Sequence, residues 1–143
     1  MRYVDASALV KGYVQEADTR YVRRLLTRGS AATNRLSFVE VASAVGRLGR
    51  EGRLSEDQRS TALATLTADA ASILVVELTG EIVFRAQALT QKHALRAGDA
   101  IQLASCLYLR DTVDQSTRLV SFDDRLNTAA RLEGVKLARG RKQ

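Results

Sequence analysis

Acidic side chains follow two predicted strands of the chain. Asp5 comes directly after the strand expected over residues 2–4, and Asp123 and Asp124 come directly after the strand expected over residues 118–122. The carboxyl ends of parallel strands share one edge of a sheet, and ligands bind in the crevice outside that edge. We therefore expect these carboxylates to lie close together, although an Asp at the start of a helix is also an ordinary N-cap.

Two further carboxylates stand in apolar helical stretches. Glu40 lies within the otherwise uncharged residues 38–45, and Asp99 begins a stretch with no second charge before Arg110. Burying such a carboxylate is unfavourable unless a positive group meets it, and no basic residue adjoins either acid in the sequence. Asp99 followed by Gln102 also matches a helix capping box, whereas an acid inside a helix, such as Glu40, is not a cap.

Together these acids favour a divalent-metal site. Mg²⁺ takes oxygen ligands and keeps several waters, and a divalent ion assists the hydrolysis of phosphodiesters. The single Cys106 excludes an internal disulfide and a cysteine-based zinc site, and the single His93 argues against a His-dependent triad. Because burial and like charge both disfavour ionised carboxylates, at least one of the clustered acids should have a raised pKa.

The charge balance points to a polyanionic partner. The 143 residues carry 22 Lys and Arg against 16 Asp and Glu, a formal net charge of +6. Without the five candidate acids, 11 acids stand against 22 basic residues, which gives +11 outside the site. Nucleic acid is the natural partner for such a surface, although +6 also fits ordinary solubility. The 5% aromatic content, with no Trp, argues against a sheet that binds single strands by stacking bases.

The chain has the length of one domain, which we expect over residues 1–138, followed by a basic tail at residues 139–143. No apolar run approaches the roughly 20 residues of a membrane helix. Asp5 also stands where a signal peptide would have its apolar stretch. We therefore expect a cytoplasmic protein without a membrane partner.

Hydrophobic periodicity predicts alternating strands and helices. Strands are expected at residues 2–4, 31–34, 73–78, 118–122 and 135–137. Helices are expected at residues 6–14, 19–28, 37–50, 55–70, 81–93, 99–109 and 124–132. Such alternation implies crossover connections, and hence an α/β fold with a parallel sheet covered on both faces.

Four segments, in this order and at these spacings, resemble the successive signatures of PIN-domain ribonucleases: residues 3–11, 37–41, 95–104 and 119–126. More narrowly, the chain resembles the toxins of VapBC-type toxin–antitoxin modules. The likeness extends from Tyr3 to about Leu137. It implies a three-layer α/β/α sandwich with a central parallel sheet, and a Mg²⁺- or Mn²⁺-dependent endoribonuclease.

The resemblance also implies roles for individual residues. The catalytic acids would be Asp5, Glu40, Asp99 and Asp123. The metal ligands would be Asp5, Asp99, Asp123 and Asp124, with the sequence leaving open whether Asp123 or Asp124 faces the ion. Ser7 and Ser121 would be supporting hydroxyls. Ala6 and Gln102 stand where many members have Thr and His, so we expect the ligand-orienting roles of those side chains to be absent here.

The partners implied by the resemblance are an RNA substrate, a cognate antitoxin protein that silences the toxin, and a second copy of the chain in a homodimer. Two other enzyme classes fit less well. A phosphatase using Asp5 as nucleophile would have a second Asp where Ser7 stands, and a phospho-receiver domain would have paired acids before its first helix. A non-catalytic, basic nucleic-acid-binding module is the alternative function.

Overall fold

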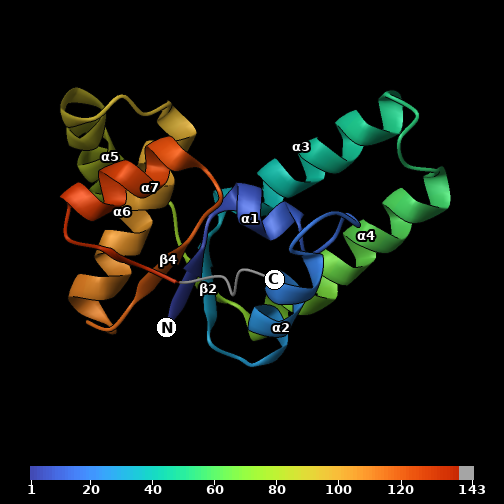
Figure 1. Ribbon diagram of the computed structural model, residues 1–143, viewed down its shortest axis with the longest axis horizontal. Coiled ribbons are helices and arrows are strands. Elements are labelled where there is room, and N and C mark those ends of the chain that lie inside the picture. Colours follow the sequence, from blue (N-terminus) through green and yellow to red (C-terminus); the bar gives the residue numbers. More distant parts are fainter. Residues whose placement is uncertain (139–143) are drawn as a thin grey trace.

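Five parallel strands form the centre of the structure, a computed structural model that describes residues 1–138 (Figure 1). The strands are β1 (Arg2–Val4), β2 (Ala31–Asn34), β3 (Leu74–Val76), β4 (Arg118–Val120) and β5 (Lys136–Leu137), in the order β3-β2-β1-β4-β5. Every neighbouring pair is parallel, as the sequence predicts. The predicted tail at residues 139–143 lies outside the described residues.

Successive residues of the central strands face opposite sides of the sheet, and both sides are apolar. Tyr3 and Leu119 belong to one buried core, whereas Val4 and Val120 belong to the other. This alternation follows from the pleat of a strand. A sheet that is apolar on both faces must be covered on both, which is why its strands have few polar residues.

Helices cover both faces and complete the three-layer α/β/α sandwich that the sequence predicts. One layer contains α1 (Ala6–Val10), α2 (Thr19–Thr27), α3 (Leu36–Arg50) and α4 (Glu56–Asp69), which is followed by a short 3-10 turn at Ala70–Ser72. The other layer contains α5 (Gly80–Lys92), α6 (Ala97–Thr112) and α7 (Asp124–Leu132). Figure 1 shows the two layers on either side of the strands.

Several element boundaries differ from the sequence prediction, and three of them adjoin the candidate site residues. The first helix ends at Val10 rather than residue 14, because the next residues form tight turns in which Lys11 N bonds to Ala8 O. Gly12 packs so closely against α2 that an added Cβ would lie 3.1 Å from Val22. The strand β4 ends at Val120, so the following residues form a loop, and α6 begins at Ala97 rather than residue 99.

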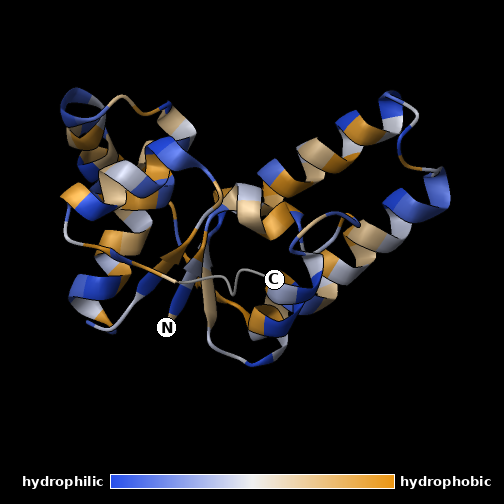
Figure 2. Cartoon of the chain, viewed as in Figure 1, coloured by the Kyte–Doolittle hydropathy of each residue, from blue (hydrophilic) through white to orange (hydrophobic). Residues whose placement is uncertain are grey.

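The helices α3 and α4 form an arm that projects from the sheet (Figure 1). A turn at Gly52, with a φ of 71°, leads to a capping box in which Ser55 and Gln58 bond reciprocally at the start of α4. Figure 2 shows hydrophilic residues gathered where α3 ends and α4 begins. Within residues 1–138, no helix is both long and apolar enough to cross a membrane.

Candidate active site

The candidate site lies where the order of strands changes direction. From β1 the chain continues to β2 and β3 on one side, and then returns to β4 and β5 on the other. Such a switch point, outside the carboxyl ends of the strands, is where α/β sheets bind ligands. Asp5 follows β1 and Asp123 follows β4, so the two predicted acids share this edge.

Asp5 is buried at the start of α1. Its Oδ1 accepts a hydrogen bond from Ala8 N at 2.8 Å and so caps the helix. Its Oδ2 accepts from the hydroxyls of Ser7 at 3.0 Å and Ser121 at 2.8 Å, the two serines that the resemblance implies as supporting hydroxyls. The Asp5 residue is only 1% exposed. Burial raises the pKa of Asp5 to about 6, although the hydrogen bonds favour the ionised form.

Asp99 lies inside the first turn of α6 and is not its N-cap. The helix begins at Ala97, and Arg96 occupies the cap position without a side-chain capping bond. The capping-box interpretation of Asp99 and Gln102 is therefore wrong. Burial raises the pKa of Asp99, the negative charge of Asp123 raises it further, and Arg96 opposes the change.

Glu40 projects from α3 toward the start of α6. Its Oε2 accepts a hydrogen bond from Gln102 Nε2 at 3.0 Å. A Cβ added at Gly98 would lie 3.0 Å from Glu40 Oε1, so the glycine leaves room for this carboxylate beside Asp99. Burial raises the pKa of Glu40, and the charge of Asp99 raises it further.

Gln102 orients Glu40, a role that the sequence analysis predicted to be absent at this position. The Gln102 amide is 2% exposed, and its Oε1 accepts a hydrogen bond from the Tyr3 hydroxyl at 2.7 Å. Its Nε2 donates to Glu40 and, at 3.0 Å, to Ser37 Oγ. The Ser37 hydroxyl also accepts a hydrogen bond from Thr33 at 2.7 Å. An amide thus stands where many family members have an imidazole, and a buried polar network holds it in place.

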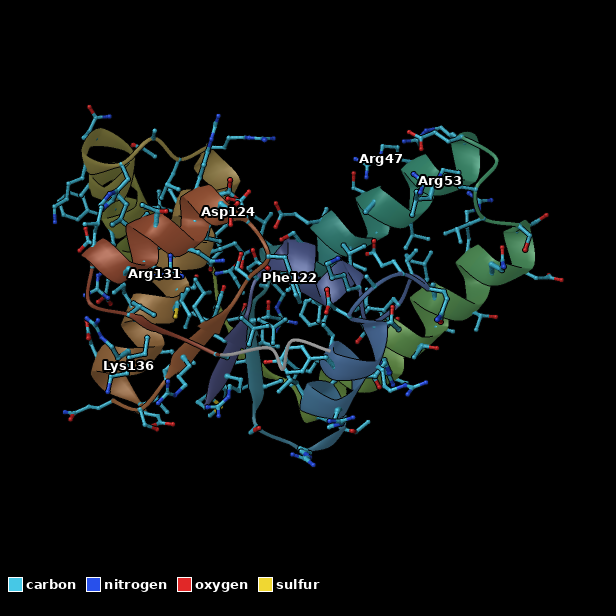
Figure 3. The ribbon with its side chains drawn as sticks, viewed as in Figure 1. Arg47, Arg53, Phe122, Asp124, Arg131 and Lys136 are labelled. Atoms are coloured by element: carbon cyan, nitrogen blue, oxygen red, sulfur yellow. The ribbon has the colours of Figure 1, made fainter. Side chains whose placement is uncertain are left out.

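The structure places Asp123 and Asp124 differently. Asp123 caps α7, because its Oδ1 accepts from Leu126 N at 2.9 Å, and its charge acts on Asp99. Asp124 is exposed and lines a separate hollow of about 590 Å³ between α5 and α7, beside Lys92 and Arg125. Figure 3 shows Asp124 at the start of α7. The geometry therefore brings Asp123 to the site and leaves Asp124 outside it.

Asp99 is the central member of the acidic cluster. Its charge raises the pKa of both Asp5 and Glu40, and its own pKa responds to Asp123. The sequence analysis predicts a raised pKa for at least one acid of the cluster, and the pKa is raised for Asp5, Glu40 and Asp99. None of the ion pairs formed within residues 1–138 includes any of the four.

Asp5, Glu40 and Asp99 line a cavity of about 420 Å³ that opens between α1, α3 and α6, whereas Asp123 is not part of its lining. Its lining residues are Asp5, Ala6, Ser7, Val10, Glu40, Ala44, Arg47, Arg96, Asp99 and Gln102. Carboxylate and hydroxyl oxygens without a cationic partner match the donor chemistry of a hard divalent cation. Over residues 1–138, however, no three Asp, Glu, His or Cys side chains are gathered as a ready metal-ligand set. The cavity therefore matches a divalent-cation site in the chemistry and charge of its oxygen donors.

A second hollow, of about 450 Å³, lies between the α1–α2 connection and α4. Among its lining residues, Asp57 is the one carboxylate, and Tyr13, Thr61 and Thr65 supply hydroxyls. A single exposed acid lacks the clustered charge that shifts pKa values or attracts a divalent ion. The chemistry therefore points to the cavity of Asp5 and Asp99.

Comparison with known proteins identifies similar chains. Residues 2–132 match the family model of the PIN domain. The chain is 33% identical to Ribonuclease VapC45 and to Ribonuclease VapC49 of Mycobacterium tuberculosis, over 95% of this chain and 93% of each relative. It is 32% identical to Ribonuclease VapC47 of the same organism, over 96% of both chains. A solved toxin–antitoxin complex from Klebsiella pneumoniae shares the fold, with a TM-score of 0.60 and 16% sequence identity over 86% of this chain and 87% of that chain.

Proposed function

The chain belongs to the PIN domain family, and from that premise we propose that it is a divalent-metal-dependent endoribonuclease and the toxin of a toxin–antitoxin pair. One observation carries the proposal. Carboxylates with raised pKa values surround Asp99 at the switch point of the sheet, and none of them forms an ion pair within the described chain. The relatives named Ribonuclease VapC support RNA as the substrate.

In this proposal the four acids have different roles. Asp5 and Asp99 would hold the principal cation, and Asp123 would bind it directly or through a water. Glu40 would orient the attacking water or a second ion, and Gln102 fixes the Glu40 carboxylate through its hydrogen bond of 3.0 Å. Ser7 and Ser121 hold Asp5 in place. Of the two adjacent acids that the resemblance offers as ligands, the proposal takes Asp123 rather than Asp124, since Asp124 lines the separate hollow between α5 and α7.

A cation of the Mg²⁺ or Mn²⁺ type, when bound, would supply positive charge to the phosphoryl oxygens and lower the pKa of a nearby water. The chain's own residues supply the rest. Arg47 and Arg96 stand on the wall of the same cavity, where their guanidinium groups are suited to phosphate oxygens. The surplus of positive charge elsewhere attracts the RNA backbone toward an otherwise acidic centre.

The same acidic centre suits an inhibitory partner. An antitoxin that places an Arg among Asp5, Glu40 and Asp99 would pair with them bidentately and exclude the cation. The proposal also includes a homodimer. In a host that lacks the antitoxin, expression of the chain should arrest growth, and expression of Asp99→Asn should not. Growth that is equally unaffected by both chains would contradict the toxin assignment.

The decisive assay incubates purified protein with total RNA in Mg²⁺, in Mn²⁺ and in EDTA. We expect internal cleavage with either metal and intact RNA in EDTA. The variant Asp99→Asn should leave RNA intact under all three conditions, whereas Asp57→Asn, which changes an exposed acid in the other hollow, should cleave as the parent does. Shifted mobility of uncut RNA in the presence of metal would instead support the non-catalytic binding module.

A further inference from the structure

Phe122 presents an exposed aromatic ring on the loop that carries two residues of the site. The residue is 39% exposed, and it stands between Ser121 and Asp123. The backbone N of Asp123 donates a hydrogen bond to Ser121 Oγ at 3.1 Å, which closes the turn. The same Oγ donates to Asp5 Oδ2 at 2.8 Å. The ring is therefore carried by a turn that is bonded directly to the acidic centre.

Lys11 lies over one face of this ring. Its Nζ is 4.8 Å from the centroid of Phe122, which is the geometry of a cation–π contact. Lys11 is the C-cap of α1, and Asp5 is its N-cap. The length of this five-residue helix therefore separates Lys11 from Asp5. Lys11 also forms an ion pair with Glu16, in which Nζ lies 3.9 Å from Glu16 Oε2, a long distance for such a pair. Figure 3 shows Phe122 beside α1, near the middle of the view.

We propose that Phe122 and Lys11 form a nucleotide subsite beside the cleavage centre, where an unpaired base of single-stranded RNA stacks on the exposed part of the ring and the Lys11 ammonium binds its phosphate. The proposal rests on the proposed ribonuclease function and deepens it. Every nucleobase has a π face, so such a subsite positions the strand without reading its sequence. It would favour unpaired over double-helical RNA, because a paired base cannot leave its stack without an energetic penalty.

The low aromatic content does not oppose this subsite. It argues against a whole sheet of stacking residues, whereas one ring beside the scissile phosphate is enough to hold a strand in register. Phe84 provides an internal comparison, since it is 76% exposed on α5. Among the cation–π contacts of residues 1–138, none involves Phe84, and its helix contributes no residue to the lining of the acidic cavity.

The first test uses Phe122→Trp, because the chain has no Trp and the introduced indole reports on its own surroundings. The background is Asp99→Asn, which is expected to prevent cleavage, and the probe is a short single-stranded RNA without secondary structure. Stacking of a base should quench the fluorescence as RNA is added. The matched variant Phe84→Trp should show no quenching. Binding of RNA without quenching of the Phe122→Trp variant would overturn the proposal.

The second test measures cleavage and affinity with Phe122→Leu in the parent chain and in the Asp99→Asn background. Base stacking on an aromatic side chain is worth about 1–3 kcal/mol, so affinity should fall roughly 5- to 150-fold and KM should rise in proportion, with little change in kcat. Phe122→Tyr should restore binding, and Phe84→Leu should have no effect. Lys11→Gln should reduce the salt dependence of binding by about one phosphate contact.

These outcomes separate the subsite from the proposed function. A parent chain that neither binds nor cuts RNA would overturn the proposed function itself. A parent chain that cuts RNA, together with Phe122→Leu binding RNA within twofold of its parent, would overturn the subsite alone. Unchanged RNA affinity with weakened binding of a protein partner would assign the ring to that partner and would also overturn the subsite. Melting curves of each variant check that the fold is retained.

Discussion

Replacing Asp5 by Asn should stabilise the metal-free protein at neutral pH. Asp5 is 1% exposed, and burial raises its pKa to about 6. The amide carries no charge, so it avoids the desolvation that opposes ionisation at this position. It can still accept from Ala8 N, and the hydroxyls of Ser7 and Ser121 can turn to accept from its NH₂ group. The substitution therefore removes the charge and keeps the cap.

The magnitude follows from the two pKa values. An Asp has an ordinary pKa of 3.8, and the folded-state value is about 6. At about 1.4 kcal/mol per pH unit, the difference corresponds to about 3 kcal/mol. Because the folded-state pKa is the higher one, the folded state keeps a proton that the unfolded state has already released. The stabilisation from Asp5 is complete below pH 3.8 and is lost as the pH rises to about 6.

The assay compares chemical unfolding of the parent chain and Asp5→Asn in EDTA from pH 4 to pH 8. Near pH 4 the two free energies of unfolding should be similar. Above pH 7 the variant should be more stable by about 3 kcal/mol, or about 10 °C in melting temperature. Asp111→Asn is the matched control. Burial raises the pKa of Asp111, but the hydrogen bonds and charges of Arg110 and Arg85 together hold it below its usual value, so the pH dependence of this variant should have the opposite sign.

Mg²⁺ provides a second comparison in the same assay. A ligand that binds the folded state alone raises its stability, so Mg²⁺ should stabilise the parent chain more than Asp5→Asn. A variant that is no more stable than the parent above pH 7, with a stability difference independent of pH, would refute the burial argument for Asp5. An equal increase in the stability of both proteins with Mg²⁺ would refute the role of Asp5 in holding the cation.

Three further predictions concern the site and its surroundings. Conversion of each proposed site acid to its amide should remove nearly all RNA cleavage in a gel assay with Mg²⁺, with the fold retained by circular dichroism: Asp5→Asn, Glu40→Gln, Asp99→Asn and Asp123→Asn. Asp124→Asn should retain most activity, and full activity of Asp99→Asn would return that residue to a structural role. Gln102→Leu should lower the free energy of unfolding, measured with denaturant, by about 1–3 kcal/mol, because the Tyr3 hydroxyl loses its acceptor. It should also slow cleavage, because Glu40 loses its hydrogen bond to Gln102. Gln87→Leu, at an exposed glutamine, should have neither effect. RNA affinity of a cleavage-deficient chain, measured by anisotropy, should fall steeply between about 50 and 200 mM salt, and a flat response would show that the basic surplus does not bind phosphates.

The fold could be predicted largely because each element carries its own local signal. The last two residues of β1 and of β4 are apolar, and in each strand one of them packs on one face of the sheet and the other on the opposite face. The pair Ser55 and Gln58 marks the start of α4. The end of α1 had no such signal. After Val10 the chain forms tight turns in which Gly12 packs closely against α2, and a contact between separate elements cannot be deduced from local periodicity.

The site was partly predictable for the same reason. Asp5 and Asp123 follow strands, and Glu40 is conspicuous among valines, so their positions on a shared edge follow from the parallel sheet. Gln102 was missed as an orienting residue because its partner Tyr3 lies 99 positions away in the sequence. A glutamine inside an apolar helical stretch was the available signal, since a buried amide requires hydrogen-bond partners.

The sequence analysis treats capping and metal binding as competing interpretations of the same acids, but a carboxylate that caps a helix with one oxygen keeps a second oxygen that a ligand could use. Asp123 caps α7 with Oδ1, which fixes the carboxylate at the edge of the site while its charge acts on Asp99. Asp5 caps α1 in the same way. Folding of the helix thereby orients the functional group, and no separate scaffold is required. Because Asn keeps a cap and Ala removes it, Asp123→Asn should lose cleavage at nearly unchanged stability, whereas Asp123→Ala should lose cleavage and about 1 kcal/mol of stability.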